Sequence, residues 1–265
     1  MSLSSPLNLQ ELLDRCIGHI NRPTDLIFCS LVARSWVDPS QRALFRAPHR
    51  TKPIIEWSDK LLLATLNASP RLIRLVREIK AAHVLSRLTH KTLMDICNFP
   101  FTHLQKVYID WEKGFVPNPL HQILSIPTVT HIKLHVSVES IWNFMHIWEH
   151  VSPALRHLDV QFSGCRRSSL PSVPPDLVLI PLHTLRLKFV RNQHDVFPWI
   201  LYPFALENLT AVSIDNEMGV DWNVFAKQSI TVLDIVFTDA VPIIDLTAFP
   251  NLSWLCVRPT NKSSG

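Results

Sequence analysis

Leu182-His183-Thr184-Leu185-Arg186-Leu187 carries apolar residues at its first, fourth and sixth positions, and this pattern recurs along most of the chain. Successive copies begin 28, 25, 26, 27, 27, 21 and 22 residues apart. A period of roughly 20–29 residues predicts a repeat architecture in which neighbouring units share one core. The eight copies are Val76/Ile79/Ala81, Leu104/Val107/Ile109, Val129/Ile132/Leu134, Leu155/Leu158/Val160, Leu182/Leu185/Leu187, Leu209/Val212/Ile214, Ile230/Leu233/Ile235 and Leu252/Leu255/Val257.

Each copy predicts a short β-strand, because its alternating apolar residues would point to one face. Helical patterns lie between several copies, at Ser86–Asn98, Ser140–His150, Asp195–Leu201 and Asp221–Lys227. One strand and one helix cannot bury their apolar faces alone, so neighbouring units are expected to stack into a curved solenoid. The period resembles that of leucine-rich repeats, although the Asn or Cys of their consensus is largely absent. The expected fold class is therefore α/β, with a leucine-rich-repeat-like solenoid of about eight irregular repeats over residues 76–258.

A two-layer α/β domain that happens to alternate strands with helices is the other fold that this pattern allows. Such a domain favours Gly-rich turns at its strand ends for ligand binding, and the chain has only five glycines. We therefore expect the solenoid. The polar stretch Ser163–Pro175 is interpreted as a surface insertion.

The N-terminal region follows a helical pattern instead. Apolar residues recur at steps of three and four between Leu9 and Ile20, which predicts an amphipathic helix capped by Asn8. Pro23 interrupts the chain, and Thr24 is the expected cap of a second helix.

This second helix is apolar on more than one side, with Trp36 the last of its apolar residues. A helix of this kind needs cover on two faces, and in so small a module the second cover is expected to be another protein. Pro39 is expected to start a third helix over Ser40–Phe45.

Four motifs follow one another in this region: Glu11-Leu12-Leu13, Asp25-Leu26, Cys29-Ser30-Leu31-Val32-Ala33-Arg34-Ser35-Trp36 and Leu44-Phe45. Their order resembles that of an F-box, the three-helix domain that binds the Skp-type adaptor of cullin–RING ubiquitin ligases. The resemblance implies an F-box-like domain over residues 1–50. It also implies that the adaptor-facing surface, or its support, is formed by Leu9, Leu12, Ile17, Leu26, Val32 and Trp36. Helical spacing alone would suit an ordinary cap on a larger domain.

Residues 51–75 are expected to form a helical junction, with a helix over Ser58–Ala68, and residues 259–265 a flexible polar tail. The five cysteines are widely spread and never form a CxxC pair. This usage favours a reducing compartment, cytoplasmic or nuclear, over a disulfide framework or a zinc site. We expect no secretory signal and no transmembrane helix.

The sequence contains no motif of nucleotide binding, hydrolase or metalloprotease chemistry. His146 and His150 are spaced as two metal ligands on one helix could be, but no third ligand is indicated, so packing is the favoured role. The net charge of +4 comes without a run of basic residues, which disfavours nucleic-acid or membrane binding. We therefore expect no catalytic residues, no bound metal and no cofactor.

The polar residues between the apolar strand positions are expected on the concave face of the solenoid. This face is rich in His, Lys and Arg, and protonated histidines would make it more positive. Tyr108 and Trp254 are aromatic residues of the kind that anchor protein interfaces. The expected target-binding residues are Lys106, Tyr108, Lys133, His135, His157, Arg186, Lys188 and Trp254.

An acidic or phosphorylated target segment could pair with Lys133, Arg186 and Lys188. A solvated face with no specific partner is the alternative. The F-box resemblance implies a substrate-recognition subunit of an SCF-type (Skp–cullin–F-box) ubiquitin ligase, which binds the Skp adaptor through its helices and an unknown target through its repeats. The other functions left open are a repeat scaffold outside ubiquitination and an adaptor-binding protein without a ligase role.

Overall fold

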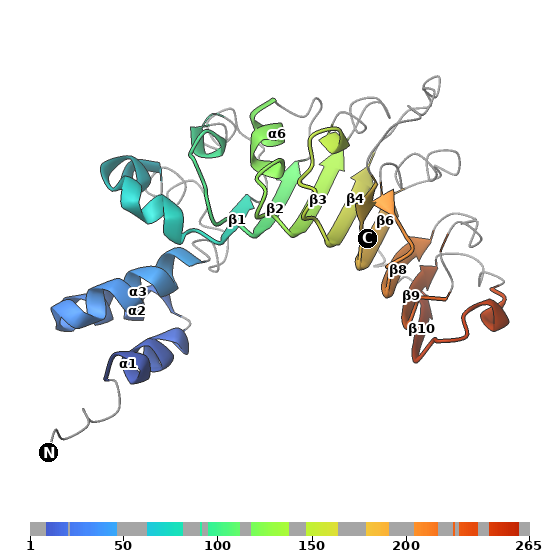
Figure 1. Cartoon of the computed structure of the whole chain (residues 1–265), viewed down its shortest axis with the longest axis horizontal. Coiled ribbons are helices and arrows are strands. Elements are labelled where there is room, and N and C mark those ends of the chain that lie inside the picture. Colours follow the sequence, from blue (N-terminus) through green and yellow to red (C-terminus); the bar gives the residue numbers. More distant parts are fainter. Residues whose placement is uncertain are drawn as a thin grey trace, which may run out of the picture.

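Parallel strands stacked in sequence order form the main body of the molecule in the computed structural model (Figure 1). The structure describes residues 9–20, 22–46, 63–81, 91, 95–111, 118–137, 147–163, 179–190, 204–216, 225, 228–237 and 244–259. The eight strands of the sheet are β1 (Glu78–Ala81), β2 (Lys106–Trp111), β3 (His131–Ser137), β4 (His157–Ser163), β6 (Thr184–Val190), β8 (Ala211–Asn216), β9 (Val232–Phe237) and β10 (Trp254–Pro259).

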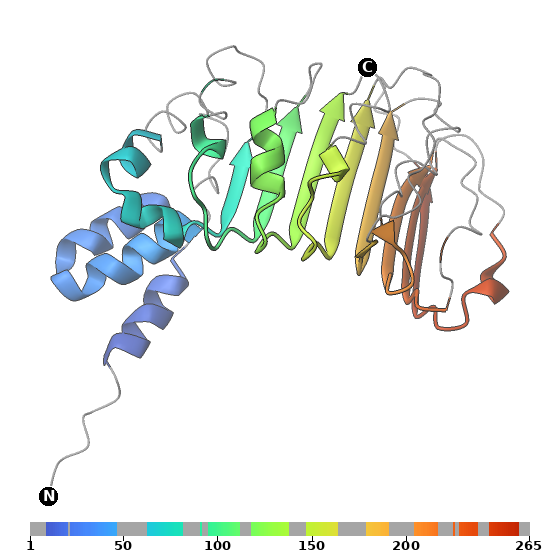
Figure 2. The same cartoon turned by 45° about the horizontal axis from the view of Figure 1, so that its top comes forward.

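The strands lie side by side in the order β1-β2-β3-β4-β6-β8-β9-β10, and every neighbouring pair is parallel (Figure 2). Each strand carries one of the eight sequence units. The sheet bends into an arc, and α6 (Asn118–Leu124) lies on its outer side (Figure 1). The predicted α/β solenoid of parallel strands is confirmed.

The apolar positions of the units build one continuous core. Register places Ile79, Val107 and Ile132 side by side across β1, β2 and β3, and the fourth positions of later units continue this row. The fourth and sixth positions of the units on β2, β3, β4, β6, β8 and β9 are at most 2% exposed. Each unit therefore contributes the same stripe of apolar surface, and burial between neighbours stabilises the stack.

Hydroxyl groups before the strands connect successive units. Thr128 donates a hydrogen bond to the carbonyl oxygen of Leu104, at 2.6 Å, and Ser229 donates to that of Leu209, at 2.8 Å. Ser253 Oγ donates to the carbonyl oxygen of Thr231, at 3.0 Å. These bonds satisfy backbone carbonyls at the turns that precede the strands.

A second, two-stranded parallel sheet pairs β5 (Ile180–Pro181) with β7 (Phe204–Ala205). Trp148 packs edge-on against Phe204, with ring centroids 5.2 Å apart. The six-residue pattern gave no signal for these strands. Two short 3-10 helices, η1 (Pro70–Leu75) and η4 (Leu246–Ala248), precede β1 and β10.

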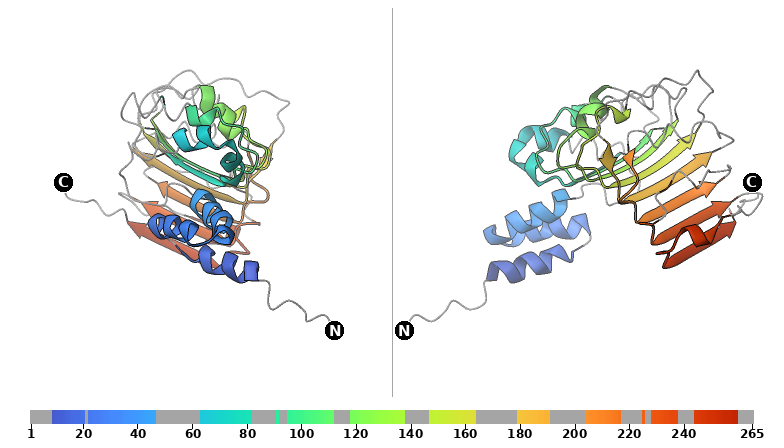
Figure 3. Two further views of the ribbon diagram at one scale, coloured as in Figure 1. Left: turned by 90° about the vertical axis from the view of Figure 1, so that its left-hand side faces the viewer. Right: turned by 45° about the vertical axis from the view of Figure 1, so that its right-hand side comes forward.

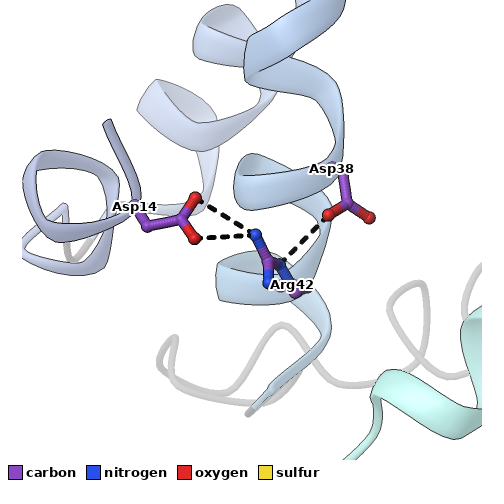
Figure 4. A network of polar contacts seen from close by, with 3 residues as sticks. All are labelled: Asp14, Asp38 and Arg42. Atoms are coloured by element: carbon purple, nitrogen blue, oxygen red, sulfur yellow. Dashed lines mark hydrogen bonds and ion pairs between the residues drawn. The ribbon is translucent and has the colours of Figure 1, made fainter. Parts of the chain in front are cut away.

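Three helices form what we call the helical module: α1 (Leu9–Gly18), α2 (Pro23–Val32) and α3 (Arg34–Arg46). It lies at the β1 end of the arc, with α3 against η1 (Figure 3). Arg42 of α3 forms ion pairs with Asp14 of α1, at 2.9 Å, and with Asp38, at 3.2 Å (Figure 4). The first of these pairs connects two helices of the module.

The predicted helix boundaries in this module are partly wrong. The second helix ends at Val32, because Ala33 adopts an extended backbone (φ −156°, ψ 157°), and Trp36 therefore belongs to α3. Pro39 lies inside α3 rather than before it. Its missing N–H costs a backbone hydrogen bond, but its side chain is buried and so contributes packing. Thr24 is not the N-cap of α2, because Arg22 occupies that position. Pro23 lies in the first turn of the helix, where the fixed φ of the proline ring is favourable.

The junction is helical over residues 63–68, and Leu66 is buried. Several predicted segments lie wholly or largely outside the described residues, so they stay predictions: the start of the junction, the helices at Ser140–His150, Asp195–Leu201 and Asp221–Lys227, the insertion Ser163–Pro175 and the tail. Of Ser86–Asn98, the described part is helical at residue 91 and over 95–97. Burial raises the pKa of the Cys97 thiol to about 12.

Candidate functional site

Large apolar side chains are exposed on one side of α2. Phe28 is 67% exposed, Leu31 75% and Val32 65%. Ile27, one turn before Leu31, is 49% exposed. Spacings of one, three and four residues place these four side chains on neighbouring positions of one helix surface. We call Ile27, Phe28, Leu31 and Val32 the apolar patch.

The predicted adaptor-binding residues divide into exposed and buried ones. Val32 belongs to the apolar patch, and Leu12 of α1 is 46% exposed. Ile17 and Leu26 are buried in the module, so they can support a surface but not form it. Trp36 is half-buried in α3, and Leu9 lies at the start of α1.

Ile27, Phe28 and Leu31 are the residues of the patch that the sequence prediction missed. All three lie in the helix that is apolar on more than one side, and this was the available signal. Which side would be left uncovered depends on how α2 packs against α3, and the spacing of apolar residues does not reveal that.

The second candidate surface is the side of the sheet opposite the apolar core. Strand register sorts its side chains into three rows. The first row contains Glu78, Lys106, His131, His157, Thr184, Ala211, Val232 and Trp254; the second contains Lys80, Tyr108, Lys133, Asp159, Arg186, Ser213, Asp234 and Cys256; the third contains Asp110, His135, Gln161, Lys188, Asp215, Val236 and Arg258. We call these residues the polar face. All eight predicted target-binding residues lie on it.

A groove of about 430 Å³ runs along the polar face from β2 to β10. Five of the predicted target-binding residues line it: Tyr108, Lys133, His157, Arg186 and Trp254. The other three, Lys106, His135 and Lys188, lie on the same face outside the groove. The structure thus brings most of the predicted set into one concave site.

Ion pairs neutralise much of the predicted positive charge. Lys133 Nζ lies 3.0 Å from Asp159 Oδ2, and His135 Nδ1 lies 2.8 Å from Asp110 Oδ1. Two nitrogens of Arg258 donate to the carboxylate of Asp234, at 3.2 and 2.5 Å. The sequence held the signal for Lys133 and Asp159, since each follows the fourth position of its unit.

Histidines occupy the middle of the first row. His131 and His157 stack with their ring centroids 4.0 Å apart, and the Nδ1 atoms lie 2.8 Å from the hydroxyl oxygens of Thr130 and Thr184, respectively. Burial, together with the positive charges of His157 and Lys106, lowers the pKa of His131 to about 4. Burial and the charge of His183 also lower the pKa of His157.

Protonation, which would make this face more positive, is therefore disfavoured at His131 and His157. Burial favours the neutral imidazole, and two stacked rings cannot both take a charge cheaply. The two residues offer planar, uncharged surface at neutral pH.

The C-terminal half of the groove contains an apolar strip, of which the sequence prediction assigned only Trp254. Ala211, Val232 and Trp254 are neighbours in the first row, and all three line the groove. The side chain of Trp254 is 48% exposed. The signal was present, since Ala211 and Val232 occupy the same position in their units as His157.

Within the described ranges, no three or more His, Cys, Asp or Glu residues gather as metal ligands. His150 contacts His121 edge-on, at 5.5 Å between ring centroids, and its predicted companion His146 lies outside those ranges. No helix in the described part of the chain is long and apolar enough to cross a membrane. Neither a family model nor a curated protein matches this chain.

Proposed function

We propose that this protein is a substrate-recognition subunit of an SCF-type ubiquitin ligase. In this proposal α2 and its neighbours bind the Skp-type adaptor, and the polar face binds the target. The observation that carries the proposal is the apolar patch, whose four large side chains are about half to three quarters exposed. Its support from sequence is the F-box-like order of motifs through Cys29–Trp36 and Leu44-Phe45.

The apolar patch favours a partner over a simple capping role. A cap would turn its apolar side chains toward the first repeat, yet the module meets η1 through α3. Burying one large apolar side chain is worth roughly 1.5–3 kcal/mol, so four side chains offer a substantial gain on binding. Clustered exposure of this kind marks interaction sites.

The proposed mechanism requires no chemistry from this chain. The cullin–RING core would carry the ubiquitin-conjugating enzyme, and this protein would hold the target beside it. Holding two reactants together raises the effective concentration of target lysines near the ubiquitin thioester. No cofactor takes part in such a role.

A non-enzymatic repeat scaffold outside ubiquitination is the second candidate. The polar face with its groove favours it equally, because a binding surface serves either role. The two candidates differ only in whether the apolar patch takes an adaptor. A third candidate, an adaptor-binding protein that works outside ubiquitination, would bind the adaptor through the same patch but would not act in a ubiquitin ligase.

Co-purification of the full chain with its Skp-type adaptor tests the proposal. Phe28→Asp and Val32→Asp place charges in the patch and should abolish binding, because a buried unpaired charge is costly. Leu246→Asp is the matched control, since Leu246 is 46% exposed but lies in η4, far from the module. Circular dichroism would show that each variant keeps its fold. Absence of binding by a well-folded parent would refute the ligase role and leave the scaffold.

A further inference from the structure

Arg186 differs from the other cationic side chains that line the groove. Lys133 is paired with Asp159, and Arg258 with Asp234. Arg186 lies between these pairs on β6, beside Asp159 of β4 and Ser213 of β8, and its side chain is exposed. Among the described residues, no carboxylate forms an ion pair with it.

The charge of the groove is consequently small and localised. Three cations and two carboxylates line it among the described residues, so one positive charge is left over. A guanidinium binds one carboxylate or phosphate well, with two parallel hydrogen bonds. A strongly acidic segment would instead have to displace Asp159 and Asp234 from their partners.

The apolar strip of Ala211, Val232 and Trp254 lies close to Arg186. Adjacent strands are about 4.8 Å apart, and the strip is offset from Arg186 by one row, about 7 Å along the strands. Val232 and Trp254 therefore lie roughly 12–16 Å from Arg186. An extended peptide advances about 3.3 Å per residue, so about four residues cover this distance.

We propose that the groove binds an extended target segment with one acidic residue and one large apolar residue about four positions apart. The acidic side chain pairs with Arg186, and the apolar side chain packs on Val232 and Trp254. The inference rests on the proposed target-binding role of the polar face. It replaces the expected acidic cluster paired with Lys133, Arg186 and Lys188 by a single anionic contact.

Panning a random twelve-residue peptide library on the immobilised full chain tests this inference. The expected result is enrichment of peptides with one Asp or Glu and one Trp, Phe or Leu about four positions apart. Arg186→Ala should remove the enrichment. Arg71→Ala is the matched control, because Arg71 is an exposed arginine of η1 that lies outside the groove.

A charge exchange gives the sharper readout. Replacing the acidic residue of an enriched peptide by its amide should weaken binding roughly tenfold or more. The Arg186→Glu variant should no longer bind the parent peptide, and should bind the version of it in which Lys replaces the acidic residue. No enrichment, preference for polyacidic peptides, or equal losses in Arg186→Ala and Arg71→Ala would each overturn the inference.

The experiment separates this inference from the proposed function. Peptide binding is measured without the adaptor, so Phe28→Asp should leave it unchanged. Adaptor binding should in turn survive Arg186→Ala. Failure in one assay with success in the other identifies which of the two proposals is wrong.

Discussion

The helical module and the solenoid place their apolar residues in opposite ways. The fourth and sixth positions of the units on β2, β3, β4, β6, β8 and β9 are at most 2% exposed, whereas the apolar patch on α2 is 49–75% exposed. Both regions are made of similar residue types. The solenoid buries its apolar side chains in its own core, and this burial stabilises the fold. The module leaves some of its own apolar side chains exposed and available to a partner. Identical side chains therefore have different expected roles, and substitutions in the two regions can test this.

The largest difference is expected for one substitution made in both regions. Leu187→Ala removes a side chain that is 0% exposed, and should lower the free energy of unfolding by about 2–5 kcal/mol. Leu31→Ala, at a side chain 75% exposed, should change it by no more than about 0.5 kcal/mol. Urea titration of both variants measures this. A large cost at Leu31 would mean that the patch stabilises the free protein.

A second pair compares the middle of the solenoid with its end. Leu185 of β6 is 2% exposed, and the equivalent Leu255 of β10 is 40% exposed. Leu255→Ala should therefore cost about half as much as Leu185→Ala or less, since less apolar surface leaves water there on folding. Equal losses of unfolding free energy in urea would show that β10 is covered as fully as β6.

A third prediction concerns pH and the polar face. The pKa of His131 is about 4 in the folded protein, against about 6.5 in an unfolded chain. Between these values the unfolded chain binds more protons, so the free energy of unfolding should decrease as pH falls from 6.5 to 4. Solvent screening of the partly exposed ring limits this contribution to about 1 kcal/mol.

His131→Gln should remove that part of the pH dependence, as measured by urea midpoints across the window. His19→Gln in the module is the control, because His19 is exposed directly after α1. Equal pH profiles for the parent and His131→Gln would contradict the prediction.

The smallest effect is expected inside the module. Arg42 and Asp14 form their ion pair at the surface, with side chains 47% and 38% exposed. Arg42→Ala should therefore lower the free energy of unfolding by only about 0.2–1 kcal/mol, and less at high salt. Thermal melts at two salt concentrations test this. A larger loss of stability that is the same at both salt concentrations would show that Arg42 stabilises the module by packing.

The solenoid could be predicted from sequence because each unit repeats one local rule. Alternation within a strand decides which residues point inward, and the period decides which strands are neighbours. The same rule placed all eight predicted target-binding residues on one face. Aligning the units would also have paired Lys133 with Asp159.

The module resisted prediction because its pattern does not repeat. Whether Phe28 faces α3 or water depends on helix packing, and the break at Ala33 depends on one backbone conformation. The lowered pKa of His131 comes first from burial and then from the charge of His157, which lies 26 residues away in the sequence and stacks on it. The strands β5 and β7 are two residues each, too short for any periodicity to reveal.

Strand order gives this chain a simple route for change over evolutionary time. Each strand of the main sheet touches only the strands before and after it. Duplication or deletion of one unit would need repacking at two junctions only, with the rest of the stack translated along the arc. The groove could thus lengthen or shorten between lineages and acquire new specificities while the helices at the other end stay unaltered.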